Sequence, residues 1–131
     1  MTSRTIHIVG RLVCCALSGA ILLIGCSFNS VVSNLTVDPV TFSPNADGED
    51  DITRISYSIS QDTTIDLFFV DEEGQRHYYR QGEVRVPGDY FFWFGGAVDN
   101  RLLPDGEYTV VLEAQEGSGV AHLEAPMVIS G

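Results

Sequence analysis

Lysine is absent from this chain of 131 residues, so its seven basic side chains are all arginine, against 18 aspartates and glutamates. Only five arginines follow Cys26, whereas all the acidic residues do, so residues 26–131 carry a formal charge of 5 − 18 = −13. A surface of this charge repels nucleic acid and anionic lipid headgroups. We therefore expect no nucleic-acid partner.

Long apolar runs are also missing, with one exception near the start of the sequence. Arg4 and Arg11 precede an apolar stretch, Leu12 to Ile24, that is too short to span a membrane comfortably and has the features of a secretory signal. The stretch ends in Leu23-Ile24-Gly25-Cys26, which resembles the lipobox of bacterial lipoproteins. The resemblance implies a signal peptide at 1–25 that is removed, and acylation (palmitate among the chains) of Cys26.

Lipid attachment at this position decides where the protein is expected. The acyl chains would bury enough methylene groups for stable membrane anchoring. Ser27 follows the cysteine where retention in the inner membrane usually requires aspartate, so the outer membrane of a bacterial envelope is the expected location. Residues 26–33 form the acylated cysteine and a polar tether, and 34–131 form one domain.

Cysteine is scarce, which excludes disulfides from the expected domain. Cys14 and Cys15 lie in the signal peptide and Cys26 carries lipid, so no thiol pair remains. About two-thirds of the unfolded surface of such a chain is buried on folding, which is enough for a sandwich core without cross-links.

Catalytic and metal-site motifs are missing as well. The sequence has no HExxH, GxSxG, P-loop or paired-cysteine pattern. His77 and His122 stand forty-five residues apart, each on a strand whose other residues suggest exposure. A lone strand histidine is more often solvated or hydrogen-bonded than catalytic. We expect no enzyme and no small-molecule substrate.

What the domain does contain is a series of short alternating segments separated by turn residues. Alternation of apolar and polar side chains is typical of half-buried strands, and turns every eight to twelve residues indicate an antiparallel sandwich. The predicted fold is all-β, a seven-stranded immunoglobulin or fibronectin-III-like sandwich. The expected strands lie around 32–42, 52–60, 65–70, 75–80, 90–94, 107–114 and 120–129.

Some strands carry positional information. Tyr108, Val110, Leu112 and Ala114 are predicted to face inward, which is the clearest alternation in the chain. The strand at 75–80 is polar and is expected at an edge. Pro126 cannot donate a ladder hydrogen bond, so the last strand should lie at an edge or contain a bulge.

The connection Phe42 to Asp51, reading FSPNADGEDD, has two interpretations. Asn45, Asp47, Glu49 and Asp51 place oxygen ligands at alternating positions, as calcium-binding loops do, and Asp50 adds a further carboxylate. The same residues also form turns through Asx hydrogen bonds. A structural Ca²⁺ ion is therefore the one cofactor considered, and an Asx-turn network is the alternative.

Four signals occur in an order that resembles a known family. They are Ser43-Pro44-Asn45 with Asp47-Gly48 before the strand ending in Ile55 to Ser60, the Asp71 to Gly74 hairpin, Trp93 with Gly95, and Leu103-Pro104-Asp105-Gly106-Glu107-Tyr108. The series is similar to the FlgD-type immunoglobulin-like domain of flagellar hook-capping proteins. It also resembles the C-terminal domains associated with gliding motility and type IX secretion. The resemblance covers about residues 35–130.

The resemblance implies roles for two residues. Trp93 would be a core residue and Tyr108 a corner tyrosine. The chain departs from the family at Phe94, where Asp or Asn is usual, and in the spacing from Gly88 to Trp93. Whether Phe91 and Trp93 or the alternate aromatics of 90–94 face the core is therefore open.

These observations lead to an expected lipid-anchored, non-enzymatic structural or interaction module of the cell envelope. Aromatic side chains are enriched at interfaces, so those in the two aromatic strands are the candidate contacts for an envelope protein, although core packing is the alternative for each. The candidates are Tyr78, Tyr79, Phe92 and Phe94. A carbohydrate-binding or adhesion module, and an accessory subunit of a flagellar or surface assembly, are the other functions considered.

Overall fold

The computed structural model describes residues 30–131 of the chain. The predicted signal peptide at 1–25 and the acylated Cys26 lie outside the described residues. Within residues 30–131 no helix is long and apolar enough to cross a membrane.

Strands make up most of the described chain, and residues 30–131 contain no helix, as predicted. Ten strands are present where seven were predicted, because three two-residue strands join seven that are seven residues or longer. The strands are β1 Val32–Asp38, β2 Thr41–Phe42, β3 Thr53–Ile59, β4 Thr63–Val70, β5 Arg76–Arg85, β6 Gly88–Phe94, β7 Ala97–Val98, β8 Arg101–Leu102, β9 Gly106–Glu116 and β10 Gly119–Ile129.

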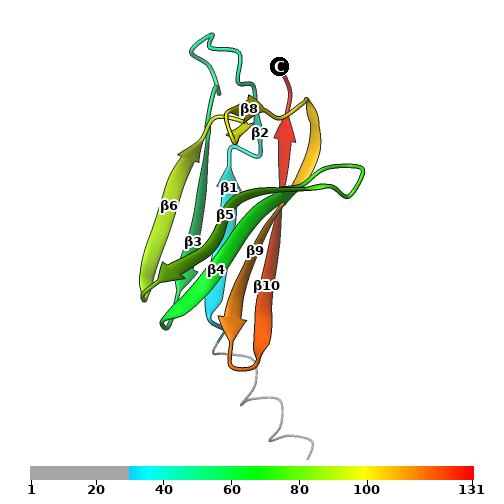
Figure 1. Cartoon of the computed structure of the whole chain (residues 1–131). Coiled ribbons are helices and arrows are strands. Elements are labelled where there is room, and N and C mark those ends of the chain that lie inside the picture. Colours follow the sequence, from blue (N-terminus) through cyan, green and yellow to red (C-terminus); the bar gives the residue numbers. More distant parts are fainter. Residues whose placement is uncertain (1–29) are drawn as a thin grey trace, which may run out of the picture.

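The strands form two main sheets that pack face to face (Figure 1). One has three strands in the order β1-β3-β6, and the other has five in the order β2-β10-β9-β4-β5. All pairings are antiparallel except the short parallel contact of β2 with β10, and β7 and β8 form a separate small hairpin. The architecture is all-β and consistent with a β-sandwich.

The core lies between the inner faces of the two sheets, and the alternation in the sequence explains it. Tyr108, Val110, Leu112 and Ala114 are all buried, as predicted for β9. Ile65, Leu67 and Phe69 of the neighbouring strand β4 join the same core, and Ile55, Tyr57 and Ile59 of β3 face them from the other sheet. A side-chain period of two directs every second residue of each strand into one core.

The sheet edges agree with the sequence. β5 is the outermost strand of the larger sheet, as its polar composition predicts. β10 has β9 on one side, and on its other side β2 reaches only Val128 and Ile129. Pro126 therefore lies on a stretch whose other side is unpaired, which is where a residue without an N–H is tolerated.

The two ends of the sandwich differ. β1 begins at one end, and the loop of residues 43–51 and the C-terminus lie at the other (Figure 1). Val31 and Val32 are buried, and the Val31 N–H donates to Glu116 Oε2 at 3.0 Å. Val31 and Val32, which the prediction assigned to the tether, therefore pack in the core with the domain.

Candidate functional site

Strand β6 contributes exposed aromatic side chains to the candidate site, because its five consecutive aromatics divide between the two faces of the sheet. Phe94 is 1% exposed and Tyr90 and Phe92 are partly buried, whereas Phe91 is 54% and Trp93 57% exposed. The core role that the resemblance implied for Trp93 is therefore wrong. Because side chains along a strand point alternately to its two faces, only every second one of the five aromatics can face the interior.

The four residues predicted as partner contacts belong mainly to the interior. The Tyr79 ring stacks on Phe92 at 4.8 Å, and Phe94 stacks on Phe69 at 4.5 Å. Buried Phe94 has no surface to offer a partner, which corrects that prediction. Phe92 and Tyr79 are half-buried against the core.

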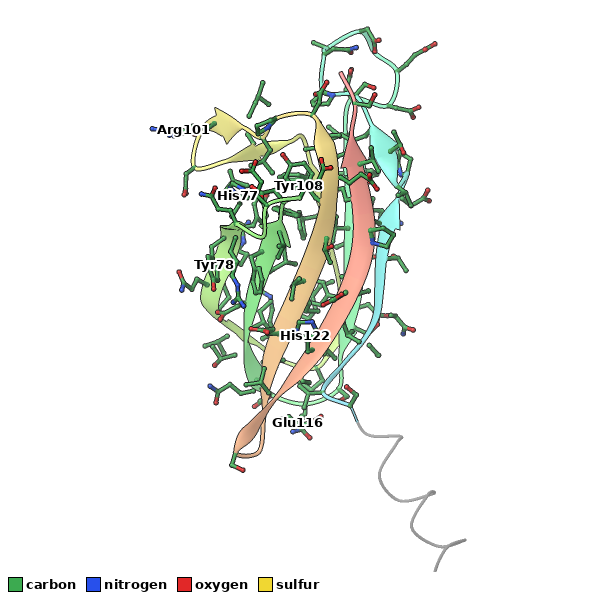
Figure 2. The ribbon with its side chains drawn as sticks, turned by 90° about the vertical axis from the view of Figure 1, so that its right-hand side faces the viewer. His77, Tyr78, Arg101, Tyr108, Glu116 and His122 are labelled. Atoms are coloured by element: carbon green, nitrogen blue, oxygen red, sulfur yellow. The ribbon has the colours of Figure 1, made fainter. Side chains whose placement is uncertain are left out.

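Tyr78 points to the outer face of the larger sheet (Figure 2). Its ring lies 4.9 Å from that of Phe68, which together with Val111 is buried outside the main core. Phe68 and Val111 are cross-strand partners. Tyr78 therefore acts first as a cover for this small apolar cluster.

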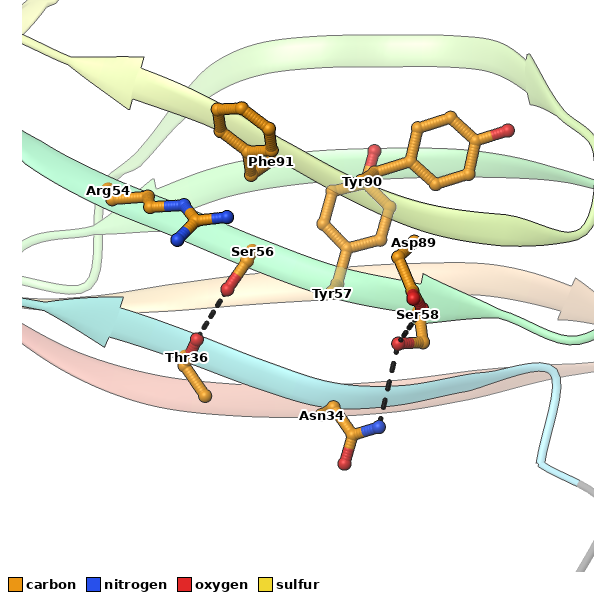
Figure 3. A pocket seen from close by; sticks show the side chains of 9 residues that line it. All are labelled: Asn34, Thr36, Arg54, Ser56, Tyr57, Ser58, Asp89, Tyr90 and Phe91. Carbon is orange, nitrogen blue, oxygen red and sulfur yellow. Dashed lines mark hydrogen bonds between the residues drawn. The ribbon is translucent and has the colours of Figure 1, made fainter.

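The outer face of the three-stranded sheet is a grid of three rows, set by strand register (Figure 3). Asp38, Arg54 and Trp93 are aligned across β1, β3 and β6 in the first row. Thr36, Ser56 and Phe91 form the second, and Ser58 and Asp89 form the third with Asn34 beside them. Register alone brings together residues that are up to 55 positions apart (Asp38 to Trp93).

A hollow of about 370 Å³ runs over the middle of this grid. Its floor is low because β3 contributes serines between the bulkier side chains of β1 and β6. The Ser56 and Thr36 hydroxyls are 2.5 Å apart, and Ser58 Oγ donates to Asp89 Oδ1 at 2.8 Å (Figure 3). The Asn34 amide completes this row by donating to Ser58 at 3.5 Å.

Arginine lies over aromatic rings instead of pairing with acids. Four of the five arginines in residues 30–131 have the guanidinium carbon within 4.3–5.3 Å of a ring centroid. The pairs are Arg54 on Phe91, Arg76 on Phe68, Arg80 on Tyr79 and Arg85 on Tyr90. Within the described chain every ion pair involves histidine, and none involves arginine. Arg76, Arg80 and Arg85 also donate to nearby hydroxyl or carbonyl oxygens, whereas Arg54 makes no hydrogen bond among the described contacts.

The loop of residues 43–51 forms an Asx-turn network. Asn45 Oδ1 accepts the N–H of Asp47 at 3.1 Å, and Asp47 Oδ1 accepts that of Glu49 at 2.8 Å. The Asp51 carboxylate accepts the N–H groups of Asp47 and Gly48 at 3.2 and 2.8 Å. Gly48 has φ +90°, a conformation that glycine adopts readily.

These hydrogen bonds account for the conformation of the loop. In residues 30–131 no group of three or more acidic, histidine or cysteine side chains is arranged to hold an ion. Asn45, Asp47 and Asp51 each use an oxygen on the backbone of their own loop. The Asx-turn interpretation explains the shape of the loop, and binding of a calcium ion there stays a prediction.

The histidines have structural partners. His77 Nε2 lies 3.0 Å from Asp71 Oδ2, while Asp71 Oδ1 accepts the N–H groups of Glu73 and Gln75 in the β4–β5 turn. The hydrogen bonds from His77 and then from the Gln75 backbone lower the pKa of Asp71. Asp71 therefore caps the predicted Asp71–Gly74 hairpin, and His77 supports it.

His122 lies on β10, between two carboxylates (Figure 2). Its Nε2 lies 2.7 Å from Glu124 Oε2 and its Nδ1 lies 3.0 Å from Glu113 Oε2. Hydrogen bonds to Glu124 and then Glu113 raise the pKa of His122 above its usual value. Both ring nitrogens are engaged, which suits a charged imidazolium better than a base.

A second hollow, of about 650 Å³, lies between the start of β5 and the β7–β8 hairpin. Arg76, His77 and Tyr78 line one side, and Arg101 and Leu102 line the other. Arg76 is already engaged, because its guanidinium lies over Phe68 and donates to the Tyr78 hydroxyl at 3.2 Å.

Comparison with protein-family models finds no family that matches this chain. Comparison with curated proteins finds none of significant similarity. The sequence prediction missed Arg54, Ser56, Phe91 and Trp93 as one surface. The alternation of β3 already placed Arg54 and Ser56 on the face away from the core. In β6, however, the sequence did not show which of the alternating aromatics point outward.

Proposed function

We propose that the protein is a lipid-anchored, non-enzymatic interaction module of the bacterial cell envelope, which docks an envelope protein on the outer face of its three-stranded sheet. The observation that carries the proposal is that Trp93 and Phe91, both more than half exposed, stand beside Arg54 on one face. Tryptophan and arginine are the residues most enriched among the contacts that dominate binding energy.

The strand order supports an immunoglobulin or fibronectin-III-like domain. Of the seven long strands, the first, second and fifth (β1, β3 and β6) form one sheet. The third, fourth, sixth and seventh (β4, β5, β9 and β10) belong to the other. This is the division of fibronectin-III-like sandwiches. The Tyr108 hydroxyl donates to the Pro104 carbonyl at 2.5 Å, as a corner tyrosine does, which supports the FlgD-type resemblance. The exposed Trp93 departs from it.

A binding role is also favoured over catalysis by the absence of a convergent reactive group in the described chain. The Asp71–His77 pair has no nucleophile beside it, because the nearby Tyr108 hydroxyl donates to a carbonyl. Burial and then the charge of Asp71 raise the pKa of Tyr108, which keeps the phenol protonated. This pair therefore stabilises the turn.

The anchor at Cys26 suits this arrangement. β1 begins at the end of the sandwich opposite the 43–51 loop, so a lipid attached before β1 would direct that loop away from the bilayer (Figure 1). Outer-membrane attachment follows from Ser27. In cells given labelled palmitate, wild-type protein should incorporate label and sediment with membranes, whereas Cys26→Ser should incorporate none. Equal labelling of the variant would contradict the anchor.

The docking face is tested by crosslinking intact cells and identifying the captured envelope protein. Trp93→Ala should reduce capture of that partner strongly, because a large exposed ring is lost from the centre of contact. Val120→Ala is the matched control, since Val120 is 63% exposed on β10 in the other sheet. Equal capture by both variants would contradict a protein partner on this face.

A saccharide is the second candidate ligand, because the hollow over Ser56 and Ser58 combines hydroxyl, amide and carboxylate groups with an exposed ring. Glycan-array binding that Trp93→Ala abolishes, without any crosslinked protein, would favour it. An accessory subunit of a flagellar or surface assembly is compatible with the main proposal and differs only in the identity of the partner.

A further inference from the structure

The free edge of β6 is the least protected strand edge among the described residues. β6 hydrogen-bonds to β3 on one side and to no strand on the other. Its seven residues run in register with β3 without a shift, from Gly88 to Phe94. Exposed edges of this kind present unpaired N–H and C=O groups to any extended chain.

The other edges carry the features that prevent such pairing. β5 includes three arginines and a glutamate within Arg76–Arg85 and pairs irregularly with β4. β1 has a register shift at Asn34, whose φ is +57°. β10 contains Pro126. In β6, Asp89 is the single charged residue and proline is absent. Natural sheets use charges, prolines and bulges to block edge pairing, so their lack in β6 is informative.

Arginines lie beside this edge in an ordered way. Arg85 covers the Tyr90 ring, and Arg80 covers the Tyr79 ring that stacks on Phe92. Both arginines therefore lie over the inward row of β6, on the flank where β5 and β6 approach. Arg54 covers Phe91 on the outward row. Three of the five arginines in residues 30–131 thus cover aromatic groups in β6 or stacked on it.

These guanidinium groups make no ion pair within residues 30–131, although the same part of the chain contains 18 carboxylates. Arg54 is the clearest case, because Asp38 is its cross-strand neighbour and yet the guanidinium lies on Phe91 instead.

Arg80 Nη1 donates to the Tyr79 carbonyl at 3.1 Å, and Arg85 donates to the Tyr57 hydroxyl and the Val84 carbonyl at 3.2 and 3.0 Å. Nη2 of each side chain makes no hydrogen bond among the described contacts, so it can still donate to a carboxylate.

We propose that an extended, acidic segment of a partner protein adds a strand to the free edge of β6. This rests on the proposed function and specifies how the partner binds. Main-chain hydrogen bonds to β6 supply affinity, as in other cases of strand addition. Alternate side chains of the added strand face outward beside Phe91 and Trp93 and are apolar. The others face Arg80 and Arg85 and are glutamate or aspartate.

A second copy of this chain is a poor occupant of the edge. Its own β6 offers one acid, Asp89, in seven residues. The arginines beside the edge select instead for a strand that alternates apolar and acidic residues.

The test uses the whole chain in detergent micelles and three synthetic peptides of nine residues. One alternates valine and glutamate, one alternates valine and lysine, and one is the valine–glutamate peptide with alternate backbone nitrogens methylated. Affinity is measured by fluorescence anisotropy, and protection of the β6 amides by hydrogen exchange. Arg80→Gln is the test variant, and Arg101→Gln, on the β7–β8 hairpin, is its control.

The glutamate peptide should bind and protect the amides of residues 88–94. The N-methylated peptide should bind roughly tenfold more weakly, because the ladder hydrogen bonds are lost. The lysine peptide and the Arg80→Gln variant should each lose about fivefold in affinity, and Arg101→Gln should lose none.

Three results would overturn strand addition by an acidic segment: no binding of the glutamate peptide at millimolar concentration, equal binding of the methylated peptide, or edge protection through self-association in sedimentation. The crosslinking result with Trp93→Ala is independent of these. If it still shows a captured partner, the proposed function stands and only the mode of binding fails; if it does not, the proposed function fails as well.

Discussion

Tyr108 combines a buried ring with a hydrogen bond that joins a strand to the preceding turn. Its side chain is 6% exposed and its hydroxyl donates to the Pro104 carbonyl. Tyr108→Phe should lower the free energy of unfolding by about 1–3 kcal/mol, because a part-buried acceptor loses its donor. Urea denaturation measures the change. Tyr78→Phe, which alters a hydroxyl on the exterior, should change it by less than about 0.5 kcal/mol, and equal effects would argue against the corner role.

His122 makes stability depend on pH near neutrality. Hydrogen bonds to Glu124 and Glu113 raise its folded-state pKa above the usual 6.5. Its stabilising contribution is therefore complete below the unfolded-state pKa and is lost as pH rises through the raised folded-state pKa. The urea midpoint should fall as the pH rises above 6.5 and through the raised folded-state pKa, and it should fall less in His122→Gln. Titration of His122 by NMR with a pKa at or below 6.5 would contradict this.

Strand β6 provides a direct comparison of neighbouring residues on opposite faces. Phe94→Ala should cost about 3–5 kcal/mol of unfolding free energy, because a buried ring is removed from contact with Phe69 and Phe42. Trp93→Ala should cost less than about 1 kcal/mol, since more than half of its surface is already exposed. Chemical denaturation of the two variants measures both values. The reverse order would mean that the strand is shifted by one residue.

The 43–51 loop can be tested in the same way. Asp51→Ala should destabilise the protein by about 1 kcal/mol, because two backbone N–H groups lose their acceptor. Glu49→Ala is the control, since no hydrogen bond of the Glu49 carboxylate occurs among the described contacts. Melting is compared with millimolar calcium and with a chelator. A calcium-dependent rise in melting temperature that both variants abolish would support the predicted metal site.

The charge of the whole molecule should make its stability depend on salt. With 18 acids in residues 30–131 and no arginine paired to any of them there, carboxylate repulsion is the main long-range term. Because the screening length falls from about 30 Å at 0.01 M salt to about 8 Å at physiological ionic strength, the melting temperature should rise over that range. Scanning calorimetry measures it, and a fall would show that attractive pairs dominate.

Much of this architecture could be predicted from local patterns in the sequence. The inward row of β9, the Asp71–Gly74 hairpin, the edge position of β5 and the all-β class follow from alternation and turn chemistry, which are properties of adjacent residues. The short strands β2, β7 and β8 have too few residues for a period to show.

The sequence by itself determined where the seven long strands lie, because side-chain alternation and turn propensity act over a few neighbours. The outer-face site was decided only by the tertiary structure. In β6 the residues on both faces are aromatic, so alternation does not tell which face is turned to the core. The packing of Phe94 against Phe69 and Phe42 decides this. That choice turned Phe91 and Trp93 outward, and register with β3 set Arg54 and Ser56 beside them.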